Sequence, residues 1–123
     1  MEKRPLVLVI DDEPDILRIV TFRLKKLGYE IYSAVNGEDG LNLIKKLKPD
    51  LVFLDIRMPI LSGYDVCEIV KKDEELKSIP IVFLTATTTS TVIEKTIEYK
   101  ADDYLIKPFE PEALLGKVKK FLG

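Results

Sequence analysis

Short runs of aliphatic and β-branched residues alternate five times with longer segments whose apolar residues recur at helical spacing. This alternation is typical of βαβ units, because consecutive parallel strands need a crossover that a helix supplies. The predicted strands are residues 6–10, 30–34, 51–54, 81–84 and 104–106. The predicted helices are residues 14–27, 38–47, 64–72, 91–99 and 111–122. The sequence therefore predicts a doubly wound (βα)5 fold of the α/β class, with helices on both faces of a five-stranded parallel sheet of order 2-1-3-4-5.

Residues that are typical of helix starts, helix ends and loops agree with these elements. Pro14 and Pro111 suit first helical turns, Gly28 suits the position after a helix, and Asn36-Gly37 marks a loop. The threonine-rich run 87–91 is expected to be a loop and helix cap. On the first helix, Ile16, Val20, Leu24 and Leu27 form the stripe that is expected to face the core.

Size and composition bound the class of protein. The 123 residues suit a single domain spanning 1–123, and 46% hydrophobic with 33% charged residues is typical of a chain that folds alone. A net charge of −2 provides no broad basic field, so we expect neither direct nucleic-acid binding nor membrane binding. Cys67 is the only cysteine and is interpreted as a packed apolar residue, which together with the lack of a signal-like start favours the cytoplasm.

The chain contains no histidine, which excludes Ser-His and Cys-His nucleophile pairs and histidine zinc sites. Any chemistry therefore falls to carboxylates, lysines and hydroxyls. Such residues stand where the predicted strands end: Asp11, Asp12, Asp55, Thr85 and Lys107. Parallel sheets bind ligands beyond the carboxyl ends of their strands, and this strand order brings the first and third strands together. We expect the three carboxylates to converge there.

Converging carboxylates repel one another unless they protonate or hold a cation. Mg²⁺, or Mn²⁺ in its place, takes oxygen ligands of this kind and typically adds phosphate oxygens. Asp12 and Asp55 are the expected direct carboxylate ligands, with Asp11 further out and a backbone carbonyl after Asp55. The alternative is that Asp11-Asp12 only caps the following helix. With a phosphoryl group present, Lys107 could pair with it and Thr85 could donate a hydrogen bond.

Four segments in order carry a family resemblance: residues 9–14 (VIDDEP), 54–59 (LDIRMP) with Gly63, 84–86 (LTA) and 101–109 (ADDYLIKPF). Over essentially its whole length the sequence resembles the receiver domains of bacterial two-component response regulators, which have a flavodoxin-like fold. The resemblance implies that Asp55 accepts a phosphoryl group from the phosphohistidine of a sensor histidine kinase or a histidine phosphotransfer protein. It also implies a Mg²⁺ site made by Asp11, Asp12, Asp55 and the Arg57 backbone carbonyl.

The resemblance further implies a switch. Thr85 would move toward the phosphoryl group and Tyr104 would turn inward, which would reshape the surface of residues 91–99, 104–106 and 111–122. That surface would signal to an output protein or domain, and phosphorylated copies could form a homodimer through it. Such a domain catalyses only its own phosphorylation and slow autodephosphorylation, so it is not an enzyme in the ordinary sense. The Lys107–Pro108 bond is expected to be cis.

Some positions are particular to this chain. Lys100 stands where many relatives have glycine, so that helix end needs another cap or a lysine at positive φ. Arg57 and Thr87 occupy positions that in the family tune phosphoryl lifetime, and Arg57 is hypothesised to screen the phosphoryl group from water. On the first helix, Asp15, Ile19, Phe22 and Arg23 are predicted to contact the kinase.

Three alternatives stay open. The chain could be the receiver portion of a longer DNA-binding transcriptional regulator. A haloacid dehalogenase-type phosphatase also combines Asp, Thr or Ser, and Lys, but it needs a second Asp where this chain has Arg57. A flavodoxin-type binder of flavin mononucleotide would need a phosphate-cradling loop after the first strand, where Asp11, Asp12 and Glu13 would repel phosphate.

Overall fold

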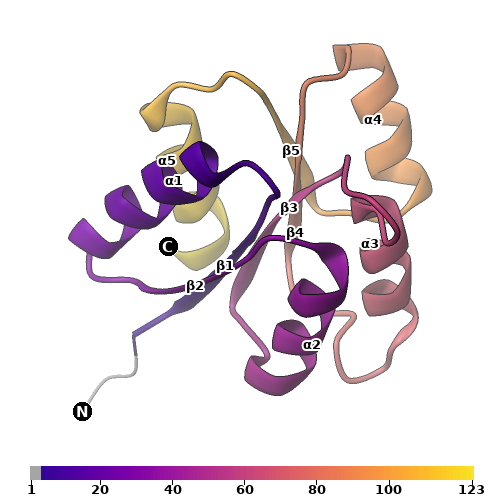
Figure 1. The fold of residues 1–123 in the computed structure, drawn as a ribbon, viewed down its shortest axis with the longest axis horizontal. Helices are drawn as coiled ribbons and strands as arrows, with labels where there is room; N and C mark the ends of the chain where they lie inside the picture. Colours follow the sequence, from indigo (N-terminus) through magenta and orange to yellow (C-terminus); the bar gives the residue numbers. More distant parts are fainter. Residues whose placement is uncertain (1–3) are drawn as a thin grey trace.

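A computed structural model describes residues 4–123 as a central parallel sheet between two layers of helices (Figure 1). The strands are β1 (Leu6–Ile10), β2 (Glu30–Ala34), β3 (Leu51–Asp55), β4 (Ile81–Thr85) and β5 (Asp103–Ile106). The helices are α1 (Pro14–Lys26), α2 (Gly37–Leu47), α3 (Gly63–Lys72), α4 (Thr89–Glu98) and α5 (Pro111–Leu122). The strand order is β2-β1-β3-β4-β5, which confirms the predicted topology. Helices α1 and α5 cover one face and α2, α3 and α4 the other.

Burial explains the apolar character of the middle strands. Every residue of β1, β3 and β4 is buried, since helices cover both faces of the sheet there. Alternate residues of β1 enter different cores: Leu8 and Ile10 pack on the side of α2 and α3, and Val7 and Val9 on the side of α1 and α5. Packing in the two cores fixes the position of each strand along its axis, and therefore the position of the strand ends.

Helix starts follow from capping. Pro14 and Pro111 lie in the first turns of α1 and α5, as predicted. The predicted loop at Asn36-Gly37 is wrong by one residue, because the Asn36 side chain accepts a hydrogen bond from the Asp39 amide and α2 already begins at Gly37. Similarly, the Thr88 side chain caps α4, so this helix starts before the predicted residue 91.

Several helix ends use a residue in the left-handed region, among them the ends of α1 and α4. Gly28 follows α1 with φ of 91°, as predicted from its position. Lys100 follows α4 with φ of 60°, and the Ala101 amide donates back to the Thr96 carbonyl. Helix α4 therefore ends with a residue in the left-handed conformation, although a lysine there has a steric cost that glycine would avoid. The Lys107–Pro108 bond is cis, as expected.

The prediction that Leu27 belongs to the core face of α1 is wrong. Val20 and Leu24 are fully buried and Ile16 is half-buried, but the Leu27 side chain is 55% exposed. The helix ends at Lys26, so Leu27 no longer follows the helical rotation that would turn it inward. A wheel projection holds only within the helix.

Cys67 is fully buried in the core on the side of α2 and α3. Burial raises the pKa of its thiol to about 12, so the thiolate that redox chemistry requires is suppressed. The interpretation of Cys67 as a packed apolar residue is confirmed. Within residues 4–123, none of the helices combines the length and the apolar character that a membrane crossing requires.

Candidate acidic site at the sheet edge

The predicted site residues share one edge of the sheet. Asp55 is the last residue of β3 and Thr85 is the last residue of β4, while Asp11 and Lys107 directly follow β1 and β5. The register places these ends side by side, with Ile10 opposite Leu54, Asp55 opposite Leu84 and Thr85 opposite Ile106. The convergence expected from the strand order is therefore confirmed.

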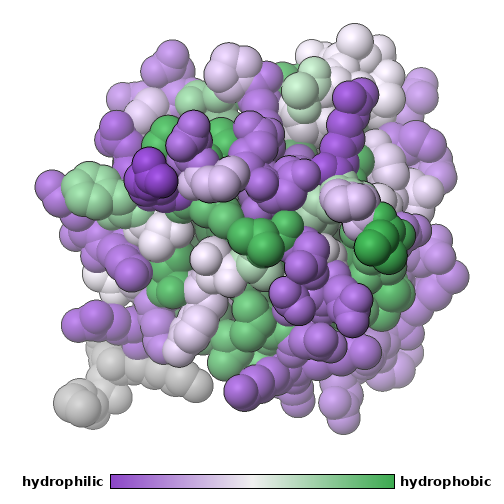
Figure 2. Space-filling model, viewed as in Figure 1, coloured by the Kyte–Doolittle hydropathy of each residue, from purple (hydrophilic) through white to green (hydrophobic). Residues whose placement is uncertain are grey.

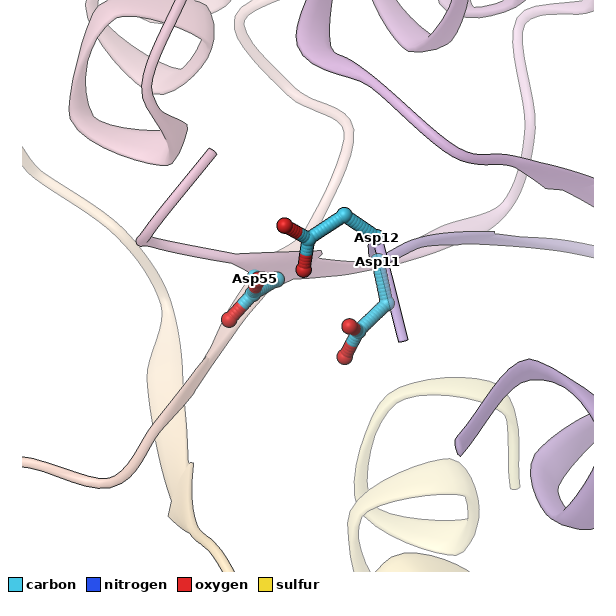
Figure 3. A group of neighbouring side chains, drawn as sticks. All are labelled: Asp11, Asp12 and Asp55. Carbon is cyan, nitrogen blue, oxygen red and sulfur yellow. The ribbon is translucent and has the colours of Figure 1, made fainter. Parts of the chain in front are cut away.

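The three aspartates form one cluster (Figure 3). One carboxylate oxygen from each of Asp11, Asp12 and Asp55 lies within 4.8 Å of the others. Asp11 is fully buried and Asp55 is 5% exposed, whereas Asp12 faces solvent. The capping alternative holds in part: Asp11 Oδ1 accepts a hydrogen bond from the Glu13 amide at 2.9 Å, although the N-cap of α1 is Glu13, whose side chain makes no capping hydrogen bond.

Lys107 is the cation that the described residues place in this cluster. Its Nζ lies 2.7 Å from Asp11 Oδ2, 2.8 Å from Glu13 Oε1 and 3.4 Å from Asp55 Oδ1, and its side chain is 10% exposed. Burial disfavours the ammonium, but the contacts with Asp11 and Glu13 outweigh it and raise the pKa of Lys107 above its usual range. Lys107 therefore stays charged under any ordinary condition.

The buried carboxylates of the cluster have raised pKa values. Burial is the main cause that raises the pKa of Asp55 to about 6, and the charge of Asp11 adds to it, while Lys107 works in the opposite direction. Burial likewise raises the pKa of Asp11 above its ordinary value. One ammonium is thus too little positive charge for this group of carboxylates.

The cluster fits a metal ion. The Lys107 ammonium directs its hydrogen bonds at Glu13 and Asp55, and although Asp11 Oδ2 lies within ion-pair distance, it receives no directed hydrogen bond. A buried carboxylate oxygen without a donor is costly unless a cation or water meets it. An all-oxygen cluster of this kind suits a hard divalent cation. The acidic cluster is therefore one that could bind a metal ion.

Thr85 and Tyr104 lie on the neighbouring strands. Thr85 is buried, and its Oγ1 accepts a hydrogen bond from the Thr87 amide at 3.1 Å, which leaves the hydroxyl proton free to donate. Tyr104 is half-buried against the core, and Lys117 Nζ lies 5.8 Å from the centre of its ring. Thr85 lies opposite Ile106 at the carboxyl ends of β4 and β5, whereas Tyr104 lies opposite Phe83, two residues earlier on β5.

The predicted docking residues share the exposed surface of α1. Ile19 is 52% and Phe22 is 60% exposed, and Asp15 and Arg23 also face solvent. Phe22 and Arg23 line a groove of about 280 Å³ between α1 and α5, together with Lys26, Leu27 and Leu115. The structure makes these side chains available to a partner, and their contact with a kinase stays a prediction.

Glu13 belongs to the site, although no role toward Lys107 was predicted for it. Its carboxylate turns back over the edge of the sheet to Lys107, 94 positions away in the chain. The only signal in the sequence is that a third acid directly follows Asp11-Asp12. Arg57, in contrast, lies in the loop after β3 and is exposed.

The fold and the acidic edge together define a doubly wound α/β domain whose polar site lies where the strand order reverses. Residues 7–119 match the response regulator receiver domain family, and the chain belongs to this family. It is therefore a receiver domain of the response regulators, a class of signalling domain.

Relatives and solved structures agree with this assignment. The chain is 41% identical over 116 residues to the probable transcriptional regulator ycf27 of Porphyridium aerugineum, covering 94% of this chain and 47% of that protein. It is 38% identical over 118 residues to the DNA-binding dual master transcriptional regulator RpaA of Synechocystis, covering 96% and 49%. The chemotaxis protein CheY4 of Vibrio cholerae superposes with a TM-score of 0.90 at 30% identity, covering 98% of this chain and 100% of that one. The chain spans about half the length of the curated relatives that it matches.

Proposed function

We propose that Asp55 is the phosphoacceptor of this receiver domain. An Asp55 carboxylate oxygen attacks the phosphorus of a phosphohistidine, and the P–N bond breaks. The electron pair of that bond stays on the imidazole nitrogen, which takes a proton from solvent, and Asp55 carries the phosphoryl group as an acyl phosphate. The observation that carries this proposal is the convergence of Asp11, Asp12 and Asp55 with Lys107 at adjacent strand ends.

Each neighbour has a role toward the transferred group. Lys107 Nζ already lies 3.4 Å from Asp55 Oδ1 and is placed to pair with a phosphoryl oxygen. The free proton of the Thr85 hydroxyl can donate to another oxygen. Asp11, Asp12, Asp55 and the Arg57 carbonyl would hold Mg²⁺ or Mn²⁺, which supplies positive charge against the carboxylates and the phosphoryl group. Incubation with acetyl phosphate and Mg²⁺ should add one phosphoryl group, and chelation of the metal should prevent it.

The conformational output follows from Thr85. When its oxygen turns toward the phosphoryl group, the hydrogen bond from the Thr87 amide weakens and the start of α4 is released. Tyr104 can then turn inward, which shifts the population between two packings of α4, β5 and α5. The exposed Ile93 and Ile97 on α4 give this surface apolar area for an output partner or a phosphorylation-dependent homodimer.

Two forms of output are proposed. The resemblance to RpaA, a longer DNA-binding protein, supports an output domain on the same chain. The similarity to the chemotaxis protein CheY4 supports the other form, in which the receiver domain signals to a separate protein. In either form, we propose a cytoplasmic domain that autodephosphorylates slowly and turns over no outside substrate, since the position two residues after Asp55 holds Arg57 and no acid.

The phosphodonor is proposed to dock along α1. Replacing Phe22 by alanine should lower the rate of phosphotransfer from the cognate histidine kinase about ten-fold, because an exposed aromatic side chain is lost from the contact. Phosphorylation by acetyl phosphate should not change, since this small donor needs no docking surface. The two rates are measured side by side on the same preparations, and unchanged transfer from the kinase would disprove the docking role.

Arg57 is proposed to shield the acyl phosphate. Its exposed side chain begins two residues beyond Asp55, and a long cation there can cover the phosphoryl group and hinder an attacking water. Replacing Arg57 by alanine should therefore speed dephosphorylation by several-fold. The rate is followed by the loss of the phosphorylated species after removal of the donor, and an unchanged or slower rate would contradict the shielding role.

A further inference from the structure

Three carboxylates surround the Lys107 ammonium before any phosphoryl group arrives. Its ammonium has three protons and three carboxylates around it: Asp11 at 2.7 Å, Glu13 at 2.8 Å and Asp55 at 3.4 Å. The longest of these distances belongs to Asp55, the residue whose phosphoryl group Lys107 is to neutralise. A phosphoryl oxygen must therefore compete with these carboxylates for the ammonium.

Burial determines which carboxylate gives it up. The Asp11 side chain is fully buried, and to leave it beside no cation would strand a charge in a poorly solvated place. The Glu13 side chain is 59% exposed, so its carboxylate can return to water at little cost. Glu13 also belongs to the N-cap of α1, where its side chain makes no capping bond that would hold it.

We propose that Glu13 is a positioning residue that competes with Asp55 for the Lys107 ammonium in the unphosphorylated domain and releases it on phosphorylation. This inference rests on the proposed function of Asp55. The Glu13 carboxylate then competes with the phosphoryl group for Lys107. This competition stabilises the unphosphorylated state and slows phosphorylation. The exchange is local, since Lys107 moves from one oxygen to another without leaving Asp11.

The test compares phosphorylation rates with acetyl phosphate at Mg²⁺ concentrations that saturate each variant. Glu13→Gln removes the charge that holds the ammonium, and the rate should rise about two- to five-fold, the factor expected for an exposed ion pair. Glu13→Asp keeps the charge but is one methylene shorter, so it loses the contact and should also accelerate the reaction. The urea midpoint of the unphosphorylated domain should change little, which separates positioning from a general effect on stability.

Glu110→Gln is the matched control. Glu110 is an exposed N-cap acid three residues after Lys107, and among the described residues it makes no hydrogen bond or ion pair with Lys107. Its rate should equal that of the unaltered domain. The inference is overturned if Glu13→Gln is phosphorylated no faster than the unaltered domain. It is also overturned if Glu13→Gln and Glu110→Gln are both phosphorylated faster while Glu13→Asp is not. An unaltered domain that takes up no phosphoryl group would instead refute the function of Asp55.

Discussion

Replacing Gly63 by alanine should lower the rate of phosphoryl uptake about a hundred-fold, the loss typical of a displacement of about 1 Å in a reacting group. A methyl group at this position would lie 2.3 Å from the Asp55 carbonyl oxygen and 2.7 Å from Ile56 Cα, both of them backbone atoms that cannot turn aside. Either the end of β3 or the start of α3 must therefore move, and the Asp55 carboxylate moves with its backbone. The variant should also lose about 2 kcal/mol of stability from overpacking.

Gly116→Ala is the matched control for this prediction. Gly116 lies in α5 with nothing within 4 Å of the added carbon, so alanine should stabilise the domain by about 0.5–1 kcal/mol and leave phosphorylation unchanged. Rates with acetyl phosphate and urea unfolding curves measure both effects. Phosphorylation of Gly63→Ala at the normal rate would show that the close approach of α3 does not set the position of Asp55.

Replacing Lys71 by methionine should destabilise the domain by about 2 kcal/mol, less than the loss for a fully buried ion pair because the Asp102 side chain is 35% exposed. The Lys71 side chain is only 9% exposed, and its Nζ contacts Asp102 Oδ2 at 2.7 Å and the carbonyls of Ile79 at 2.9 Å and Lys77 at 3.1 Å. The same Asp102 oxygen accepts the Ile81 amide. One ammonium therefore joins the end of α3 to the starts of β4 and β5.

Lys72→Met tests whether burial causes this effect. Lys72 is the next residue on α3, with a side chain that is 77% exposed and a 3.5 Å pair with Glu68 one turn earlier. Its replacement should change the free energy of unfolding by less than about 0.5 kcal/mol. Equal losses for the two variants, measured by urea denaturation, would mean that the Lys71 network contributes no more than a surface pair.

Much of the fold could be predicted because the sheet is covered on both faces. β1, β3 and β4 read as unbroken apolar runs, and the polar residue that ends each run marks the edge of the sheet. Strand order then brought Asp11, Asp55 and Thr85 to one place without any knowledge of side-chain contacts. The site was predictable because backbone topology alone determines it.

Side-chain partners across long sequence separations were not predictable. The ion pair between Glu13 and Lys107 depends on the direction in which an exposed glutamate turns, and no periodicity specifies that. The buried Asp103 is similar, since two lysines of α5 reach it from the exposed face of a helix. Burial favours its protonated form, but these lysines outweigh burial and lower the pKa of Asp103 below its ordinary value. Such pairs form only after the elements are packed.

The measurement that tests the central proposal most directly is intact mass spectrometry of the domain and of Asp55→Asn after incubation with acetyl phosphate and Mg²⁺. The unaltered domain should gain the mass of one phosphoryl group, and the variant, which lacks the carboxylate nucleophile, should gain none. Asp12→Asn, which keeps Asp55 but weakens the acidic cluster, should be phosphorylated more slowly. An adduct of equal amount on Asp55→Asn, or the lack of an adduct on the unaltered domain, would contradict the assignment of Asp55 as the phosphoacceptor.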